Sequence, residues 1–185
     1  MKKYLIITLL ALISCSSNED SHEIKDITIV TGIKLINDFG LEIGRLGNPN
    51  GLFYKKEKDQ NDPSKYVKNK IVTMYPIPAV NIFKLASQKN ILKVWVLKGQ
   101  STNVFKNVVF EDYLTNDLYT TNEVINKAIE EIKPTKLTNS LTINASKFEN
   151  GLYRVFVELE GGEIYWENTY IGDYNNDFES INYWK

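Results

Sequence analysis

The 185-residue chain has one cysteine and one histidine, Cys15 and His22. With a single cysteine, no disulfide can form within the chain, so the fold must depend on its apolar core. Because the single histidine lies near the amino terminus and outside the expected domain, no Ser-His-Asp triad, Cys-His dyad or histidine-based zinc or iron site is available there. His22 itself falls in a polar segment near the amino terminus, which removes it from any folded site.

An excess of one charge and a long apolar run are also missing. The chain has 22 basic and 23 acidic side chains, a net charge of -1, and this balance gives no electrostatic reason to expect nucleic acid as a partner. The mostly apolar run over residues 4–13 has about half of the roughly 20 residues that a membrane-spanning helix needs. A content of 43% hydrophobic and 24% charged residues is typical of a globular domain.

The amino terminus has the pattern of a signal peptide over residues 1–14. Lys2 and Lys3 precede the short apolar run, and Cys15 follows it directly. Leu12 and Ser14, three residues and one residue before Cys15, resemble the lipobox of bacterial lipoproteins, although Ile13 is bulkier than the usual residue there. The resemblance implies cleavage before Cys15, lipid on its thiol and acylation (palmitate) of the new amino terminus, which anchors the protein in a membrane. An ordinary secreted protein is the alternative.

Residues 15–26 are expected to form a lipidated, flexible tether between the membrane and the folded domain. Residues 16–23 contain no apolar side chain, and Glu19, Asp20 and Glu23 make the segment acidic. This acidic stretch resembles the export signal that follows the lipid-bearing cysteine in Bacteroidetes surface lipoproteins, while any solvated tether would also be polar. We therefore expect an outer-membrane lipoprotein on the periplasmic or the surface-exposed face.

From residue 27 the chain predicts a single mainly β domain over residues 27–185. Residues 27–36 and 41–46 are expected to pair as an N-terminal β-hairpin, and residues 55–70, rich in charge, to form a long surface loop. Further strands are expected over residues 71–75, 80–85, 91–97, 103–110, 140–144, 152–159 and 163–171, the last two joined through Gly161 and Gly162. Short strands about ten residues apart indicate a sandwich or a barrel.

One segment has helical spacing. Thr120 and Glu123 form a capping box, and the apolar residues that follow it, Val124, Ile125, Ala128, Ile129 and Ile132, lie at helical intervals before Pro134. The sequence therefore predicts one inserted amphipathic helix over residues 121–132. We expect it to pack on the protein's own sheet, with a partner helix as the alternative.

Residues 74–100 and 141–157 resemble the C-terminal sorting domain of type IX secretion. Tyr75, Pro76, Pro78 and Ala79 match its opening box, the strand ending at Gly99 and Gln100 follows, and Gly151, Leu152 and Tyr153 match its later turn. The resemblance implies an immunoglobulin-like antiparallel β-sandwich. Ile77 replaces the usual Asn, the helix is inserted, and the carboxyl end is acidic where sorting signals are basic. We therefore carry over the fold and not the sorting function.

The chain as a whole resembles Flavobacteria-like lipoproteins of the Bacteroidetes, and this resemblance implies no specific activity. The residues that carry this resemblance precede the sorting-domain box: Thr31, Gly32, Gly44 and Gly47 with the three residues that follow it. We take from it the expected habitat at the cell envelope.

The acidic, aromatic tail over residues 172–185 offers two weak sites. Oxygen ligands alternate at Asp173, Asn175, Asp177 and Glu179, as in calcium loops, but Phe178 stands where such a loop needs glycine. Aromatic residues also crowd this end: Tyr165, Trp166, Tyr170, Tyr174, Phe178, Tyr183 and Trp184. If these aromatic side chains are exposed, they would suit carbohydrate or protein binding. The alternative is that the tail packs against the domain.

These observations predict a binding or structural lipoprotein at the cell envelope, with no cofactor and no catalytic residue. Catalysis near pH 7 most readily uses histidine or a free thiol, and the chain offers neither in its domain. A protein or carbohydrate partner at the cell surface is expected. The alternative function is a carboxylate-dependent glycan-processing enzyme, or a carbohydrate-binding accessory protein, which needs only paired Asp and Glu residues.

Overall fold

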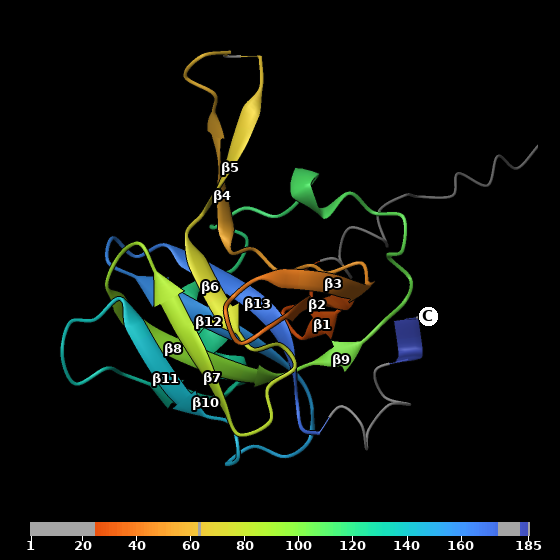
Figure 1. Ribbon diagram of the computed structural model, residues 1–185, viewed down its shortest axis with the longest axis vertical. Coiled ribbons are helices and arrows are strands. Elements are labelled where there is room, and N and C mark those ends of the chain that lie inside the picture. The colour runs from red at the N-terminus through yellow and green to blue at the C-terminus, as the bar shows by residue number, and fades with distance from the viewer. Residues whose placement is uncertain (1–24, 63, 174–181, 185) are drawn as a thin grey trace, which may run out of the picture.

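Two antiparallel sheets form the body of the protein (Figure 1). The computed structural model describes residues 25–62, 64–173 and 182–184. One sheet has four strands in the order β10–β8–β12–β13, and the other has three in the order β11–β7–β6. Their bounds are Ala128–Ile132 for β10, Ile91–Lys98 for β8, Gly151–Leu159 for β12, Ile164–Ile171 for β13, Ser140–Asn144 for β11, Ile82–Ser87 for β7 and Val72–Tyr75 for β6.

The strand order is that of an immunoglobulin-like sandwich, as the sequence predicts. The seven sandwich strands follow one another in the chain as β6, β7, β8, β10, β11, β12 and β13. The first, second and fifth of these make one sheet, and the third, fourth, sixth and seventh make the other. The chain beyond β6 then crosses to the last strand, where Ala79 bridges Ile171 in parallel. The expected strands near residues 71–75, 80–85, 91–97, 140–144, 152–159 and 163–171 are all present.

The core is densest around β12 and β13, where nearly every residue is buried. Trp95, Phe156 and Trp166 stand opposite one another on three neighbouring strands and therefore share one face of the sheet. Tyr119 covers this face, with its ring centroid 4.9 Å from that of Trp166 and 5.7 Å from that of Phe156. Residues on both faces of β12 and β13 are buried, polar side chains such as Arg154 and Asn168 included, so both faces of the four-stranded sheet are covered here.

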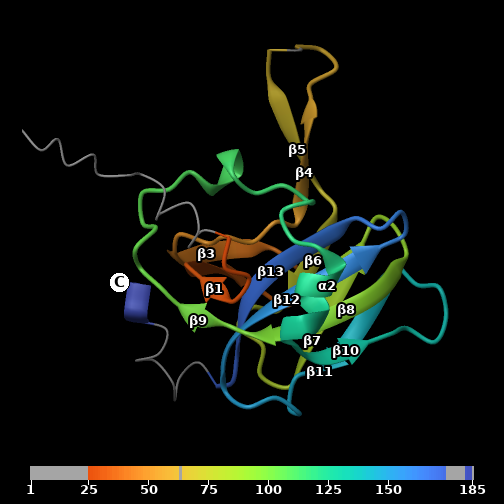
Figure 2. The ribbon, with the colours of Figure 1, turned by 180° about the vertical axis from the view of Figure 1, so that it is seen from behind.

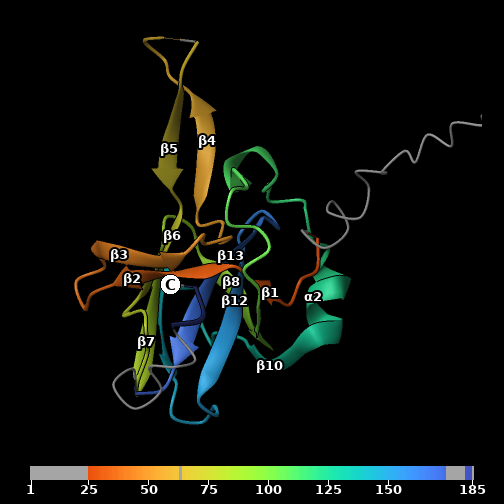
Figure 3. The same ribbon diagram turned by 90° about the vertical axis from the view of Figure 1, so that its right-hand side faces the viewer.

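The helix is shorter than the sequence predicts. α2 (Thr121–Lys127) lies against the outer face of the four-stranded sheet (Figures 2 and 3), and its capping box is present. The expected helix over residues 121–132 is wrong beyond Lys127, because residues 128–132 form β10 and supply the edge partner of β8. Glu131 of β10 accepts a hydrogen bond of 2.8 Å from Trp95 Nε1, while Ile125 and Ile129 remain exposed.

Two other expectations fail around the edges of the sandwich. Residues 55–70 are not a loop but a hairpin, β4 (Tyr54–Lys58) and β5 (Tyr66–Lys70), which projects from the body (Figure 1). Its strands are charged on both faces and bury almost nothing, so they lack the apolar alternation by which strands are recognised. Residues 103–110 form turns that lead into the 3₁₀ helix η1 (Phe110–Asp112) and not a strand, with Phe105 and Phe110 buried edge-to-face.

The N-terminal hairpin is confirmed as β2 (Gly32–Ile36) paired with β3 (Glu42–Gly47). It lies crosswise to the sandwich strands and packs against β13 (Figure 3). The short β1 (Ile29–Val30) pairs in parallel with β9 (Gln100–Ser101). Near the carboxyl end, η2 (Asn182–Trp184) places Trp184 against Gly47, and the indole Nε1 donates to the Thr102 carbonyl at 2.9 Å. No helix within the described ranges has the length and apolar character to cross a membrane.

Candidate functional site

Most of the site residues expected from the sequence lie outside the described residues. This applies to Cys15, the expected lipid attachment site, and to Asn175, Asp177 and Glu179 of the expected calcium ligands. Asp173 is described and has an interaction partner. In the part of the chain that the structure covers, no group of three His, Cys, Asp or Glu side chains is placed to hold a metal ion.

The aromatic side chains at the carboxyl end are mostly packed. Tyr165, Trp166 and Tyr170 of β13 are buried, as is Trp184 of η2, whereas Tyr183 is 45% exposed. Burial, with the nearby charges of Glu163 and Glu57, raises the pKa of Tyr165 to about 12. Tyr174 and Phe178 lie outside the described ranges. Among the described members of this group, Tyr165, Trp166, Tyr170 and Trp184 therefore add to the core, and Tyr183 alone is exposed, so these rings form no exposed aromatic patch.

The structure instead contains a cavity of about 450 Å³, which the sequence does not indicate. It lies where the β2–β3 hairpin, the base of the β4–β5 hairpin and the segment around η1 meet. This volume falls in the range of small-ligand pockets. Its apolar lining includes Ile36, Phe53, Met74, Val108, Phe110 and Leu114, and its charged lining comprises Lys34, Glu42, Arg45, Lys68, Lys70, Glu111 and Glu167.

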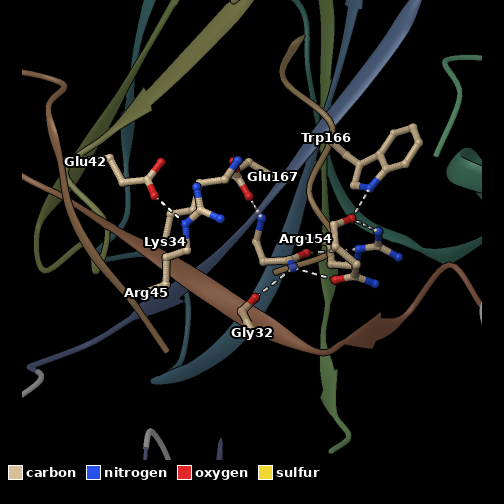
Figure 4. A network of polar contacts seen from close by, with 9 residues as sticks. Gly32, Lys34, Glu42, Arg45, Arg154, Trp166 and Glu167 are labelled. Atoms are coloured by element: carbon tan, nitrogen blue, oxygen red, sulfur yellow. Dashed lines mark hydrogen bonds and ion pairs between the residues drawn. The ribbon is translucent and has the colours of Figure 1, made fainter. Parts of the chain in front are cut away.

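The floor of the cavity is charged, and its charges are paired. Glu167 of β13, only 1% exposed in its side chain, forms an ion pair with Lys34 of β2 (Figure 4). Arg45 stands directly opposite Lys34 across the β2–β3 ladder, and its Nε donates to Glu42 at 2.5 Å. The hydrogen bond with Glu42 raises the pKa of Arg45, so the guanidinium stays charged. Both hairpin cations are therefore held by carboxylates.

Behind the floor, a buried network fixes the segment that carries Asn50 and Gly51. The fully buried Arg154 of β12 donates to the Ile27 carbonyl at 2.8 Å and to Asn168 Oδ1 at 3.2 Å. Asn168 in turn donates to Asn50 Oδ1 at 2.7 Å and to the Gly32 carbonyl at 2.9 Å (Figure 4). Because one Arg and one Asn satisfy backbone groups from three separate segments, the network fastens the amino-terminal strands to the sandwich.

Aromatic rings complete the environment of Arg154. The guanidinium carbon lies 5.5 Å from the ring centroid of Tyr119, 5.4 Å from that of Phe156 and 5.8 Å from that of Trp166. These contacts stabilise a cation that has no carboxylate among its hydrogen-bond partners in the described part of the chain. Arg154 does not line the cavity and is a structural residue.

The upper wall of the cavity comes from the β4–β5 hairpin. Lys68 forms an ion pair with Glu111 of η1 and lies 5.3 Å from the Tyr54 ring centroid. Lys56 Nζ donates to the Glu111 carbonyl at 2.5 Å. The hydrogen bond from Lys68 lowers the pKa of Glu111, whereas burial and the charges of Glu111 and Glu167 raise the pKa of Tyr54 to about 12. At neutral pH Glu111 is therefore ionised and Tyr54 is neutral.

The three lining carboxylates each have a basic partner: Glu42 has Arg45, Glu111 has Lys68 and Glu167 has Lys34. Lys70 lines the same cavity, and no acidic partner lies within ion-pair distance of it among the described residues. The arrangement can bind an anionic or polar ligand. It offers no imidazole or thiol within the described ranges for proton transfer or nucleophilic attack.

Comparisons with known proteins add little to this geometry. No protein-family model matches the chain, and no curated protein matches it. Among solved structures, the chain is similar to the PmoD soluble domain from Methylocystis sp. ATCC 49242 (Rockwell). The identity is 18%, the alignment covers 53% of this chain and 79% of that chain, and the TM-score is 0.31. A likeness of this strength carries no argument about function.

Proposed function

We propose that this protein is a lipid-anchored binding module of the bacterial cell envelope, and that its site is the cavity between the two hairpins. The anchor is expected at Cys15, on the residues that resemble a lipobox. The observation that carries the binding role is the convergence of cations from two hairpins on one partly apolar cavity. A rigid sandwich that presents such a cavity between surface hairpins suits binding.

A carboxylate-dependent glycan hydrolase is the rival function, and the cavity has the glutamates for it. Such an enzyme needs one carboxyl group that keeps its proton near neutral pH, usually through a raised pKa. The pKa of Glu111 is instead lowered by Lys68, and Glu42 and Glu167 are both ion-paired. These contacts support a role in which the three carboxylates position lysine and arginine side chains, and they disfavour a role as proton donors in hydrolysis.

The binding role is tested by titrating the full chain, purified in detergent, with neutral and acidic envelope glycans by calorimetry. A Val109→Trp variant places bulk at an exposed residue that lines the cavity, and Val104→Trp makes the same change at an exposed residue outside it. We expect saturable binding that Val109→Trp weakens and Val104→Trp leaves unchanged. Equal effects of both variants, absence of binding across the panel, or turnover of a glycan that is lost in Glu111→Gln would overturn the proposal.

The anchor and the location need separate measurements. Mass spectrometry of the amino-terminal peptide should find an acylated Cys15 as the first residue, and an unmodified Cys15 or a retained Met1 would contradict the anchor. Protease shaving of intact cells then distinguishes the two faces of the outer membrane. Digestion of the domain before lysis places it outside, and protection until lysis places it in the periplasm.

A further inference from the structure

The two faces of the β4–β5 hairpin differ in charge. In this hairpin Tyr54 stands opposite Lys70, Lys56 opposite Lys68 and Lys58 opposite Tyr66. Residues directly opposite share a face, and successive residues along a strand alternate between faces. One face therefore carries four lysines, two tyrosines and no acidic residue, and we name it the basic face: Tyr54, Lys56, Lys58, Tyr66, Lys68 and Lys70.

The other face of the same hairpin is balanced. Lys55 lies 3.9 Å from a carboxylate oxygen of Glu57 and 3.9 Å from one of Glu163. Asn69 Nδ2 donates to Glu57 at 2.6 Å. The positive charge of the hairpin is therefore concentrated on one side, and that side continues into the cavity through Tyr54, Lys68 and Lys70.

The hairpin itself does not neutralise the basic face: the acidic partners of Lys56 and Lys68 are Asp112 and Glu111, which belong to η1. Like charges directly opposite each other destabilise a ladder, and Lys56 stands opposite Lys68. A two-stranded hairpin is marginal even with favourable pairs. Lys58 and Lys70 have no acidic partner within ion-pair distance among the described residues. Such departures from local stability rules concentrate at functional sites.

We propose that the basic face and the adjoining cavity bind an acidic polysaccharide, one that carries carboxylate or sulfate groups at regular intervals. The inference rests on the proposed binding function and names its ligand class. Alternate residues on a strand lie about 7 Å apart, so the lysines form a ladder that suits repeated anionic groups and not a single anion. Tyr66, 63% exposed at the outer end of the ladder, is available to stack on a sugar ring, whereas Tyr54 at the inner end is partly buried with Lys68 over its ring.

Glu111 acts on this face as an internal substitute for the ligand. Its carboxylate pairs with Lys68, and its main-chain carbonyl accepts a hydrogen bond from Lys56. A ligand carboxylate that reaches these two lysines competes with Glu111, whose lowered pKa keeps it charged at neutral pH. Removal of the Glu111 charge should therefore strengthen ligand binding, an effect opposite to that of removing a lysine.

Calorimetry of the full chain with short galacturonate oligomers at low salt tests the proposal. A Lys58→Gln/Lys70→Gln variant removes two basic-face charges without breaking an ion pair among the described residues. The control, Lys55→Gln/Lys65→Gln, removes the same charge from residues outside the basic face. We expect the first pair to weaken binding about tenfold or more, the control to change it less than about twofold, and Glu111→Gln to strengthen it severalfold.

Three results would overturn the inference. The first is equal weakening of binding by both double variants, and the second is weaker binding by the Glu111→Gln variant. The third is binding of short single-stranded DNA as tightly as galacturonate, which would make the basic face a general polyanion surface. If a neutral glycan fills the cavity and galacturonate does not bind, the ligand class is wrong and the proposed binding function stands. If no glycan binds at all, both fail.

Discussion

The sandwich body and the β4–β5 hairpin are built in opposite ways. In β12 and β13 nearly every side chain is buried, and even the cation Arg154 is enclosed by carbonyls, an amide and three aromatic rings. In β4 and β5 almost every side chain is exposed, and two lysines stand directly opposite each other. The body thus gains its stability from burial, which the hairpin lacks.

In the proposed function, this difference in burial gives the sandwich body and the hairpin separate roles. The body can hold its geometry while the hairpin changes, because the hairpin meets the rest of the molecule mainly at Tyr54, at Lys70 and through the contacts of Glu111. Binding residues are commonly carried on such peripheral elements of a rigid scaffold. The predictions below should affect one region without the other, and they run from the largest expected effect to the smallest.

Replacement of Arg154 by Met should produce the largest loss. The Ile27 carbonyl and Asn168 Oδ1 would lose a donor in a buried setting, so we expect the free energy of unfolding to fall by on the order of 3 kcal/mol. Urea unfolding measures this, and Lys84→Met, an exposed substitution on β7, is the matched control. If both variants lose the same stability, the buried network is not what fastens the amino-terminal strands.

Replacement of Gly51 by Ala should have the next largest effect, because the added methyl group would overlap Glu167 Oε1. Overpacking of this kind costs about 1 to 3 kcal/mol. The cost should be much smaller in a Glu167→Ala background, and Gly44→Ala, whose methyl group would meet Leu35 at an ordinary 3.4 Å, should cost little. An equal cost of Gly51→Ala in both backgrounds would show that overlap with Glu167 is not the source of the loss.

Shortening of the β4–β5 hairpin should hardly affect the body. Replacement of residues 57–67 by Asn-Gly joins Lys56 to its opposite residue Lys68 through a two-residue turn. The free energy of unfolding should change by less than about 0.5 kcal/mol, the usual range for surface changes. A loss of several times that amount in chemical unfolding would mean that the hairpin is part of the cooperative core.

An effect about as small is expected for the Glu111–Lys68 ion pair. Both side chains are more than two-fifths exposed, so Glu111→Gln should cost well under about 1 kcal/mol. Because the pKa of Glu111 is lower in the folded state, its contribution is present above the unfolded pKa and is lost as the pH falls through the folded pKa. Thermal melts from pH 7 downward should therefore show the two proteins converging in acid; a difference that persists or grows there would contradict the assignment.

The sequence is sufficient to predict the strands of the sandwich core, but not the edge strand β10 or the β4–β5 hairpin. β8, β12 and β13 are rich in β-branched and aromatic residues, so their positions could be predicted from the sequence. The residues after Lys127 fit a helical spacing equally well, and only the unpaired edge of β8 decides that they form a strand. The β4–β5 hairpin has no apolar face, and so no periodicity marks its strands.

The candidate site is harder still to see in the sequence. Lys34 and Glu167 are 133 residues apart and meet only because the β2–β3 hairpin packs against β13. The basic face appears only once the register is known, since alternation along one strand does not say which lysine of the other strand shares its face. The sequence leads to the hypothesis of a binding protein, but the location of the candidate site depends on strand pairing.

Amide hydrogen exchange of the full chain, with and without a galacturonate oligomer, tests most directly the claim that the hairpin binds ligand while the body serves as scaffold. In the free protein, the amides of β4 and β5 should exchange fast and those of β8, β12 and β13 slowest. The oligomer should slow exchange in β4, in β5 and around Glu111, and leave β12 unchanged. Hairpin amides as protected as those of β12 in the free protein, or a response confined to the sandwich, would contradict the account.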